Sequence, residues 1–228
     1  VGSLAPRKSG GFIGGTEDGI AIIDPTAGRF ELVAKPEEHL PDNRFNDGKT
    51  DRQGRFWAGS LAHDHSDGAG ELWRFERDGT VTRMLDGLTI PNGIGWSLDH
   101  RTMYFIDSGP RLIRAFDFDE GAGEIANERV LVAVDPSVGA PDGLTVDAAG
   151  DLWVAVYDGG RVQRYAPDGT LREEHLVPAA QTTSCAFAGP GLHRLYVTTA
   201  TDEPLRLLAG VLAAARLAAA RGADAAGR

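Results

Sequence analysis

Apolar and polar positions alternate along this chain in short runs that are separated by turn residues. Over residues 71–85, Trp73 and Phe75 alternate with Arg74 and Glu76. This two-residue period is typical of a β-strand and differs from the period of a helix. The pattern therefore predicts short strands as the main element of the chain.

Turn signals divide these strands into hairpins. The Asp-Gly pairs at 78–79 and 168–169 favour tight hairpin turns because such turns need a positive φ. The opening region, residues 10–34, predicts two short strands. Outer hairpins are expected over residues 71–85, 111–132 and 160–177.

One pattern of a polar residue, a short strand, a turn and an aromatic strand occurs four times. The copies start 46, 50 and 42 residues apart, at Asn46, Asn92, Asp142 and Ser184. A period of about 40–50 residues that is rich in short strands indicates a β-propeller, in which each repeat forms one blade. Equivalent positions of successive blades meet near the axis, so we expect a ring of oxygen-bearing side chains there.

The repeats also predict the core and the domain limits. Large aromatic residues recur at equivalent positions and are expected to fill the wedges between blades; they are Trp57, Tyr104, Trp153 and Tyr196. We expect an all-β propeller over residues 1–200 with three complete blades, an incomplete first blade and a last blade that lacks its second half. Residues 201–228, rich in Ala and Arg, are expected to be helical or disordered.

Composition limits the function classes. The chain has 228 residues and a formal net charge of −10, and it has no cluster of basic residues. Nucleic acid and membranes are therefore not expected as partners. A lone cysteine, Cys185, allows no internal disulfide and favours the cytoplasm, and we interpret this thiol as a buried small residue. The chain begins with Val1, so we expect that its natural start is missing.

The segment RFNDGK, residues 44–49, is the richest in chemistry. The guanidinium of Arg44 and the amide of Asn46 suit a polyhydroxylated or carboxylated small molecule. Alternatively, Arg44 pairs with an acidic neighbour and Asn46 belongs to a turn. Asp64 lies on a later loop and is expected to be either solvated or at the edge of the same pocket.

Two further segments share a pattern of Pro, an oxygen-bearing residue and Gly. They are Pro91-Asn92-Gly93 and Pro141-Asp142-Gly143, and we interpret each glycine as allowing a sharp turn. Each segment alone reads as a turn. Together, at the start of two successive inner strands, their oxygens could share a Ca²⁺-like cation.

These motifs, with their order, resemble the SMP-30/gluconolactonase/regucalcin family. The resemblance rests on RFNDGKTDRQGRFWAG, IPNGIGWSLD, PDGLTVDAAGDLWVA, GGRVQRY and TTSCAFAG, and it extends over nearly all of residues 1–200. It implies a six-bladed propeller with one divalent cation in the central channel, Ca²⁺ first and Zn²⁺ or Mg²⁺ as alternatives. It also implies hydrolysis of sugar lactones such as gluconolactone. The motifs favour this branch over the paraoxonase-like and strictosidine-synthase-like propellers.

The resemblance assigns expected roles to individual residues. Asn92 and Asp142 match metal ligands, and Asp142 also matches the general base. Arg44 and Asn46 match substrate-binding residues, and Asp64 matches one more loosely. The family's further glutamate ligand, from a motif of the type E-x-P-x-W, has no counterpart in this sequence.

The leading hypothesis is therefore metal-dependent hydrolysis of a sugar lactone. Two alternatives stay open. One is a propeller that binds a divalent cation such as calcium without catalysis. The other is an inactive fragment whose exposed strand edges favour aggregation.

Overall fold

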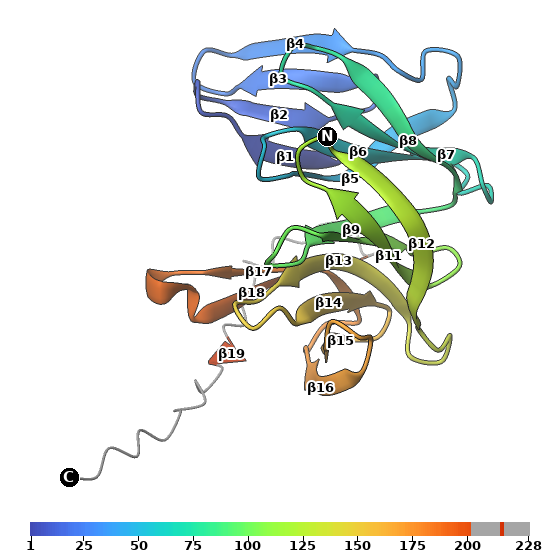
Figure 1. Cartoon of the computed structure of the whole chain (residues 1–228), viewed down its shortest axis with the longest axis vertical. Helices are drawn as coiled ribbons and strands as arrows, with labels where there is room; N and C mark the ends of the chain where they lie inside the picture. The colour runs from blue at the N-terminus through green and yellow to red at the C-terminus, as the bar shows by residue number, and fades with distance from the viewer. Residues whose placement is uncertain (202–214, 217–228) are drawn as a thin grey trace.

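The computed structural model describes residues 1–201 and 215–216 and is built almost entirely of antiparallel strands (Figure 1). The described residues form five sheets, and each sheet takes consecutive strands in chain order. Only one helical segment occurs among them, the short 3₁₀ helix η1 (Pro190–Leu192). Within the same residues, no helix has the length and apolar character needed to cross a membrane. The prediction of an all-β protein is confirmed.

Four of the five sheets have four strands, and the last has three. The first two sheets comprise β1 (Ser3–Pro6), β2 (Phe12–Gly15), β3 (Ile20–Asp24) and β4 (Arg29–Ala34), then β5 (Asn43–Thr50), β6 (Phe56–Ala62), β7 (Gly70–Phe75) and β8 (Val81–Leu88). The third and fourth comprise β9 (Pro91–Trp96), β10 (Thr102–Asp107), β11 (Leu112–Asp119) and β12 (Glu124–Ala133), then β13 (Ala140–Val146), β14 (Leu152–Tyr157), β15 (Arg161–Tyr165) and β16 (Leu171–Leu176). The fifth comprises β17 (Gln181–Ala188), β18 (Arg194–Ala200) and β19 (Ala215–Arg216).

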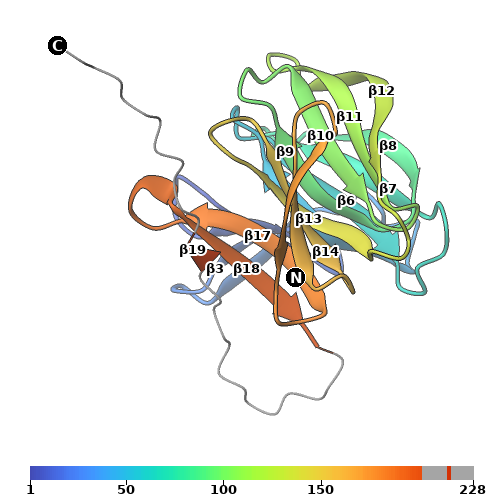
Figure 2. The same cartoon turned by 90° about the horizontal axis from the view of Figure 1, so that it is seen from below.

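The first strand of each sheet packs against the first strand of the next. Strand β1 contacts β5, β5 contacts β9, β9 contacts β13 and β13 contacts β17. In Figure 1 the sheets follow one another in chain order from the blue sheet to the orange one, and Figure 2 shows the same succession from below. This is the arrangement of blades in a β-propeller, with β1, β5, β9, β13 and β17 as the inner strands.

The structure tests the predicted strands at the N-terminal end of the chain, but it describes only part of the C-terminal end. Residues 10–34 hold three strands where two were predicted, and β1 precedes them, so the first sheet has four strands. Strand β1 has four residues and ends at a proline, so its alternation is too short to detect. Apart from β19, residues 202–228 lie outside the described part, and their helical or disordered state stays a prediction.

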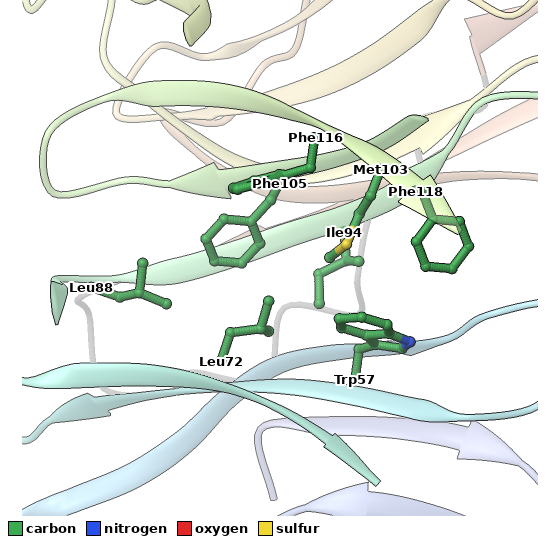
Figure 3. Close-up of a cluster of buried hydrophobic side chains, with 8 residues drawn as sticks. All are labelled: Trp57, Leu72, Leu88, Ile94, Met103, Phe105, Phe116 and Phe118. Carbon is green, nitrogen blue, oxygen red and sulfur yellow. The ribbon is translucent and has the colours of Figure 1, made fainter. Parts of the chain in front are cut away.

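The core lies in the wedges between sheets. One cluster joins the second and third sheets (Figure 3); it comprises Trp57, Leu72, Leu88, Ile94, Met103, Phe105, Phe116 and Phe118. Trp57, Tyr104 and Trp153 are buried as predicted, whereas Tyr196 is only partly buried. Burial of such large aromatic surfaces stabilises the contact between successive blades.

An aspartate ties each of two core tryptophans to the turn that precedes it. The Asp51 carboxylate accepts a hydrogen bond from the indole N–H of Trp57 at 3.1 Å and pairs with Arg55. Two repeats further along the chain, Asp147 accepts from the indole N–H of Trp153 at 2.9 Å. The spacing Asp-x₅-Trp in both repeats therefore encodes a turn, a hydrogen bond to the indole and a core tryptophan together.

We expect Asp51→Ala to lower the free energy of unfolding by about 3–5 kcal/mol, because it leaves the buried Arg55 guanidinium without its paired carboxylate and the Trp57 indole N–H without its acceptor. Urea denaturation measures the change. Asp99→Ala is the matched control, since the exposed Asp99 caps its turn through Ser97 and Arg101 without contacting a tryptophan. Equal losses in the two variants would contradict this role of Asp51.

Candidate functional site

A β-bulge interrupts three successive inner strands at their polar residues. In β5, Phe45 pairs with Ser60 and Gly48 with Ala58, so two residues, Asn46 and Asp47, face one residue of β6. The same irregularity follows Pro91 in β9 and Pro141 in β13. A bulge bends its strand and re-aims side chains. It therefore gives Asn46, Asn92 and Asp142 equivalent positions, as the repeat predicted.

Glycines after these polar residues allow the inner strands to approach closely. A Cβ added at Gly143 would lie 2.2 Å from Ser184 Oγ, and one at Gly93 would lie 2.6 Å from the Leu144 nitrogen. Neither glycine has a positive φ. The interpretation of these glycines as sharp-turn residues is therefore wrong, because what they provide is space for the neighbouring strand.

A run of side-chain hydrogen bonds connects the three bulges. Arg44 Nη1 donates to Asn46 Oδ1 at 3.0 Å, and Asn46 Nδ2 donates to Asn92 Oδ1 at 2.8 Å. Asn92 Nδ2 then donates to Ser108 Oγ at 2.7 Å, and Ser108 Oγ donates to the carbonyl oxygen of Pro141. Residues from three sheets thus form one connected network, and its last member immediately precedes Asp142.

Two carboxylates and one ammonium group share the space beside this network. Lys49 Nζ, from β5, donates to the Leu144 oxygen of β13 at 3.0 Å, which shows that these two non-adjacent inner strands face each other. Burial raises the pKa of Asp47, although the nearby Lys49 opposes this shift. Burial lowers the pKa of Lys49, and the Asp47 carboxylate acts in the opposite direction. The pair therefore holds partly compensated charge near the axis.

Among the residues of the site, Asp142 has the most informative pKa shift. Burial, together with the Asp47 carboxylate, raises the pKa of Asp142 to about 7, although the backbone N–H of Gly143 lowers it. A carboxyl group with a pKa near neutrality can both accept and release a proton under ordinary conditions. A carboxyl group of this kind beside convergent polar residues marks a candidate catalytic site.

Asp64, a predicted substrate contact, lies apart from this network. It is exposed, and its carboxylate accepts from the backbone N–H and the hydroxyl of Ser66 in its own loop. Asp64 lines a cavity of about 590 Å³, and Arg44 lines a neighbouring cavity of about 240 Å³. The two cavities share Leu40, Pro41 and Asn43.

Ser184, the fourth residue of the predicted ring, comes directly after the irregularity in its strand. The register of β17 shifts between Thr182 and Ser184. Its hydroxyl lies against Gly143 rather than in the hydrogen-bonded run. The adjacent Cys185 is buried, as interpreted from the sequence, and burial raises the pKa of its thiol to about 12. The Cys185 thiol is therefore protonated at neutral pH.

Sequence reasoning missed three residues of this site. Asp47 and Lys49 stand two apart in RFNDGK, and this strand spacing could have placed them on one face. Ser108 follows the end of β10 and comes near Asn92 only through the pairing of β9 with β10. No local pattern in the sequence marks it.

The chemistry of the site fits a hard divalent cation. Among residues 1–201 and 215–216, no group of three or more His, Cys, Asp or Glu could hold a metal ion. The candidate donors are instead the amide oxygen of Asn92 and the carboxylate of Asp142, with the Asp47 carboxylate nearby. An all-oxygen set with excess negative charge suits Ca²⁺ or Mg²⁺ better than Zn²⁺, which prefers nitrogen and sulfur ligands.

The fold and the site define a β-propeller with an oxygen-lined polar site between its inner strands. Residues 1–201 match the family model described as SMP-30/Gluconolactonase/LRE-like region. The chain belongs to this family.

The relatives support the same assignment. Regucalcin of Xenopus laevis is 39% identical over 208 residues, which are 89% of this chain and 70% of the relative. A luciferin-regenerating enzyme has a similar structure, with a TM-score of 0.81 and 35% identity over 86% of this chain and 68% of that one. The calcium-binding protein regucalcin from Agrobacterium tumefaciens also has a TM-score of 0.81, with 33% identity over 86% of this chain and 66% of that one.

The raised pKa of Asp142 predicts that its charged form lowers the free energy of unfolding, by an amount that depends on pH. With chelator present, we expect Asp142→Asn to raise the free energy of unfolding above pH 7 by roughly 1–3 kcal/mol, after allowance for partial solvent screening. The gain should shrink from pH 7 to pH 4, because the folded wild-type carboxyl then takes up its proton before the unfolded one, whose pKa is near 3.8. Urea titrations across this range measure it.

Asp117→Asn is the control for this experiment. Asp117 is exposed, and hydrogen bonds from Asn127 and Arg129 lower its pKa, so its substitution should not stabilise the protein at high pH. A constant difference between wild type and Asp142→Asn from pH 4 to pH 8 would contradict the assigned shift.

Proposed function

We propose that this chain carries the site of a metal-dependent hydrolase of sugar lactones, with Ca²⁺ as the first candidate cation. One observation carries the proposal: Arg44, Asn46 and Asn92 form a hydrogen-bonded run that leads to the residue before Asp142. Membership of the SMP-30/gluconolactonase/LRE-like family supports the substrate class. The small number of convergent polar groups is typical of a small-molecule site.

Asn92 and Asp142 would hold the cation through their side-chain oxygens, and water or substrate would complete its coordination. When bound, a divalent cation polarises a carbonyl oxygen and lowers the pKa of a bound water. Arg44 and Asn46 would orient the sugar, since a guanidinium and an amide can bind hydroxyl and carbonyl oxygens. Arg44 also lines the cavity of about 240 Å³, which gives substrate a route to this residue.

Asp142 would act as the general base. Its carboxylate accepts a proton from the attacking water, and the resulting hydroxide adds to the lactone carbonyl carbon. The ring C–O bond then breaks, and the proton held by Asp142 passes to the leaving alkoxide. The product is an open-chain hydroxy acid. A well-placed general base of this kind contributes about 10²–10⁴-fold to the rate.

A second candidate function is cation binding without catalysis. The Agrobacterium relative is described as a calcium-binding protein, and the excess carboxylate charge around Asp47 and Asp142 would favour a cation even if no lactone bound. Calorimetric titration with Ca²⁺ and a lactone assay on the same sample separate the two functions. Binding without turnover would favour this second function.

We expect the purified chain with Ca²⁺ to open gluconolactone faster than the uncatalysed rate, as measured by acid release in a pH-stat. Chelation should abolish the excess rate, and Asp142→Asn should lower kcat by about 10²-fold or more. Asp117→Asn, a change of the same kind on the exposed face of β11, should leave the rate within twofold of wild type. Full activity of Asp142→Asn would exclude it as the base, and equal rates with and without chelator would exclude the cation.

A further inference from the structure

In the hydrogen-bonded run that begins at Arg44, every bond has a fixed donor and acceptor, because a pure donor stands at one end and a pure acceptor at the other. An arginine side chain can only donate, so Asn46 must turn its carbonyl oxygen toward Arg44 and its NH₂ group toward Asn92. At the other end, the Pro141 carbonyl can only accept, so Ser108 must donate its hydroxyl proton there. The orientation of each amide between these ends follows from the chemistry of the ends.

Ser108 therefore meets Asn92 as an acceptor. Its single hydroxyl proton is used on Pro141, and its oxygen receives the NH₂ group of Asn92 at 2.7 Å. Consequently the amide oxygen of Asn92 must face the opposite way, toward Asn46, whose NH₂ group donates to it at 2.8 Å. Without Ser108, the Asn92 amide would be oriented from one side only, by the NH₂ group of Asn46, and its own NH₂ group would lose its acceptor.

The backbone around Ser108 is held firmly enough to enforce this orientation. Its own N–H donates to the Ile90 oxygen at 2.9 Å. The preceding Asp107 is 1% exposed, and its carboxylate accepts from the backbone N–H groups of Thr89 and Ile90. The end of β10 thus clamps the entry of β9 directly before Pro91 and Asn92. Ser108 is itself only 8% exposed, so water competes little for its hydroxyl.

We propose that Ser108 is a positioning residue that directs the amide oxygen of Asn92 toward a divalent cation and links it to the backbone that carries Asp142. The inference rests on the proposed cation site, and it adds a residue that touches neither cation nor substrate. Groups that orient a ligand from behind change metal affinity by about 10–100-fold when they are removed. The substitution that tests this role is Ser108→Ala, which removes both the acceptor for Asn92 and the donor to Pro141.

The control is Ser97→Ala, the same change at the opposite end of β9. Ser97 Oγ also makes two hydrogen bonds, to Asp99 and from the Thr102 N–H, but at a partly exposed turn. Calorimetric titration with Ca²⁺ alone should show about 10–100-fold weaker binding for Ser108→Ala and a change within about twofold for Ser97→Ala. A Ca²⁺ affinity of Ser108→Ala within twofold of wild type would overturn the proposal.

A second measurement uses the unmodified protein and does not depend on how the variant folds. In NMR spectra recorded without Ca²⁺, the side-chain NH₂ protons of Asn92 should exchange with solvent far more slowly than those of the exposed Gln53. Exchange as fast as that of Gln53 would show that Ser108 does not hold the amide, and would also overturn the proposal.

The outcomes separate this inference from the proposed function. If the wild type binds Ca²⁺ but opens no lactone, the lactonase proposal fails while the two tests of Ser108 still apply. If the wild type binds no Ca²⁺, the cation site fails and Ser108 has no ligand to position. If lactone is opened, saturating Ca²⁺ should restore most of kcat in Ser108→Ala, because the hydroxyl acts through Asn92 and not on the reacting atoms.

Discussion

The close approach of inner strands is the constraint on which the rest of this structure depends. Bulges in β5, β9 and β13 place a polar side chain at an equivalent position of each strand, and glycines let the next strand come within hydrogen-bonding reach. A Cβ at Gly143 would collide with Ser184, so the position that follows Asp142 has to be small. The polar site is therefore a consequence of how the blades pack, and its side chains are ordered before any ligand binds.

The same packing explains the electrostatics of the site. Asp47 and Asp142 come from non-adjacent inner strands, and protein surrounds them closely enough to raise the pKa of both. Lys49 reaches across to β13 and offsets part of this charge. The excess of negative charge that remains favours a cation, because a bound cation would stabilise carboxylates that burial destabilises. The proposed affinity for a cation and the free-energy cost of the two charged carboxylates in its absence thus have one origin.

Much of this organisation could be predicted from the sequence. The repeat placed Asn46, Asn92 and Asp142 at equivalent positions, because a blade repeats its local chemistry together with its strands. It could not place Asp64, whose loop carboxylate is held by Ser66, or find Ser108, which comes near Asn92 through strand pairing alone. The bulges also escaped prediction, since they depend on pairing between strands and not on the residues of one strand.

A crystal structure of the protein with bound Ca²⁺ tests the account most directly, because it locates the cation and the Asn92 amide together. We expect an ion about 2.3–2.6 Å from Asn92 Oδ1 and from a carboxylate oxygen of Asp142, the usual range for Ca²⁺ and oxygen. The Asn92 NH₂ group should still point to Ser108. An ion bound away from both residues, or an Asn92 amide turned so that its NH₂ group faces the ion, would contradict it.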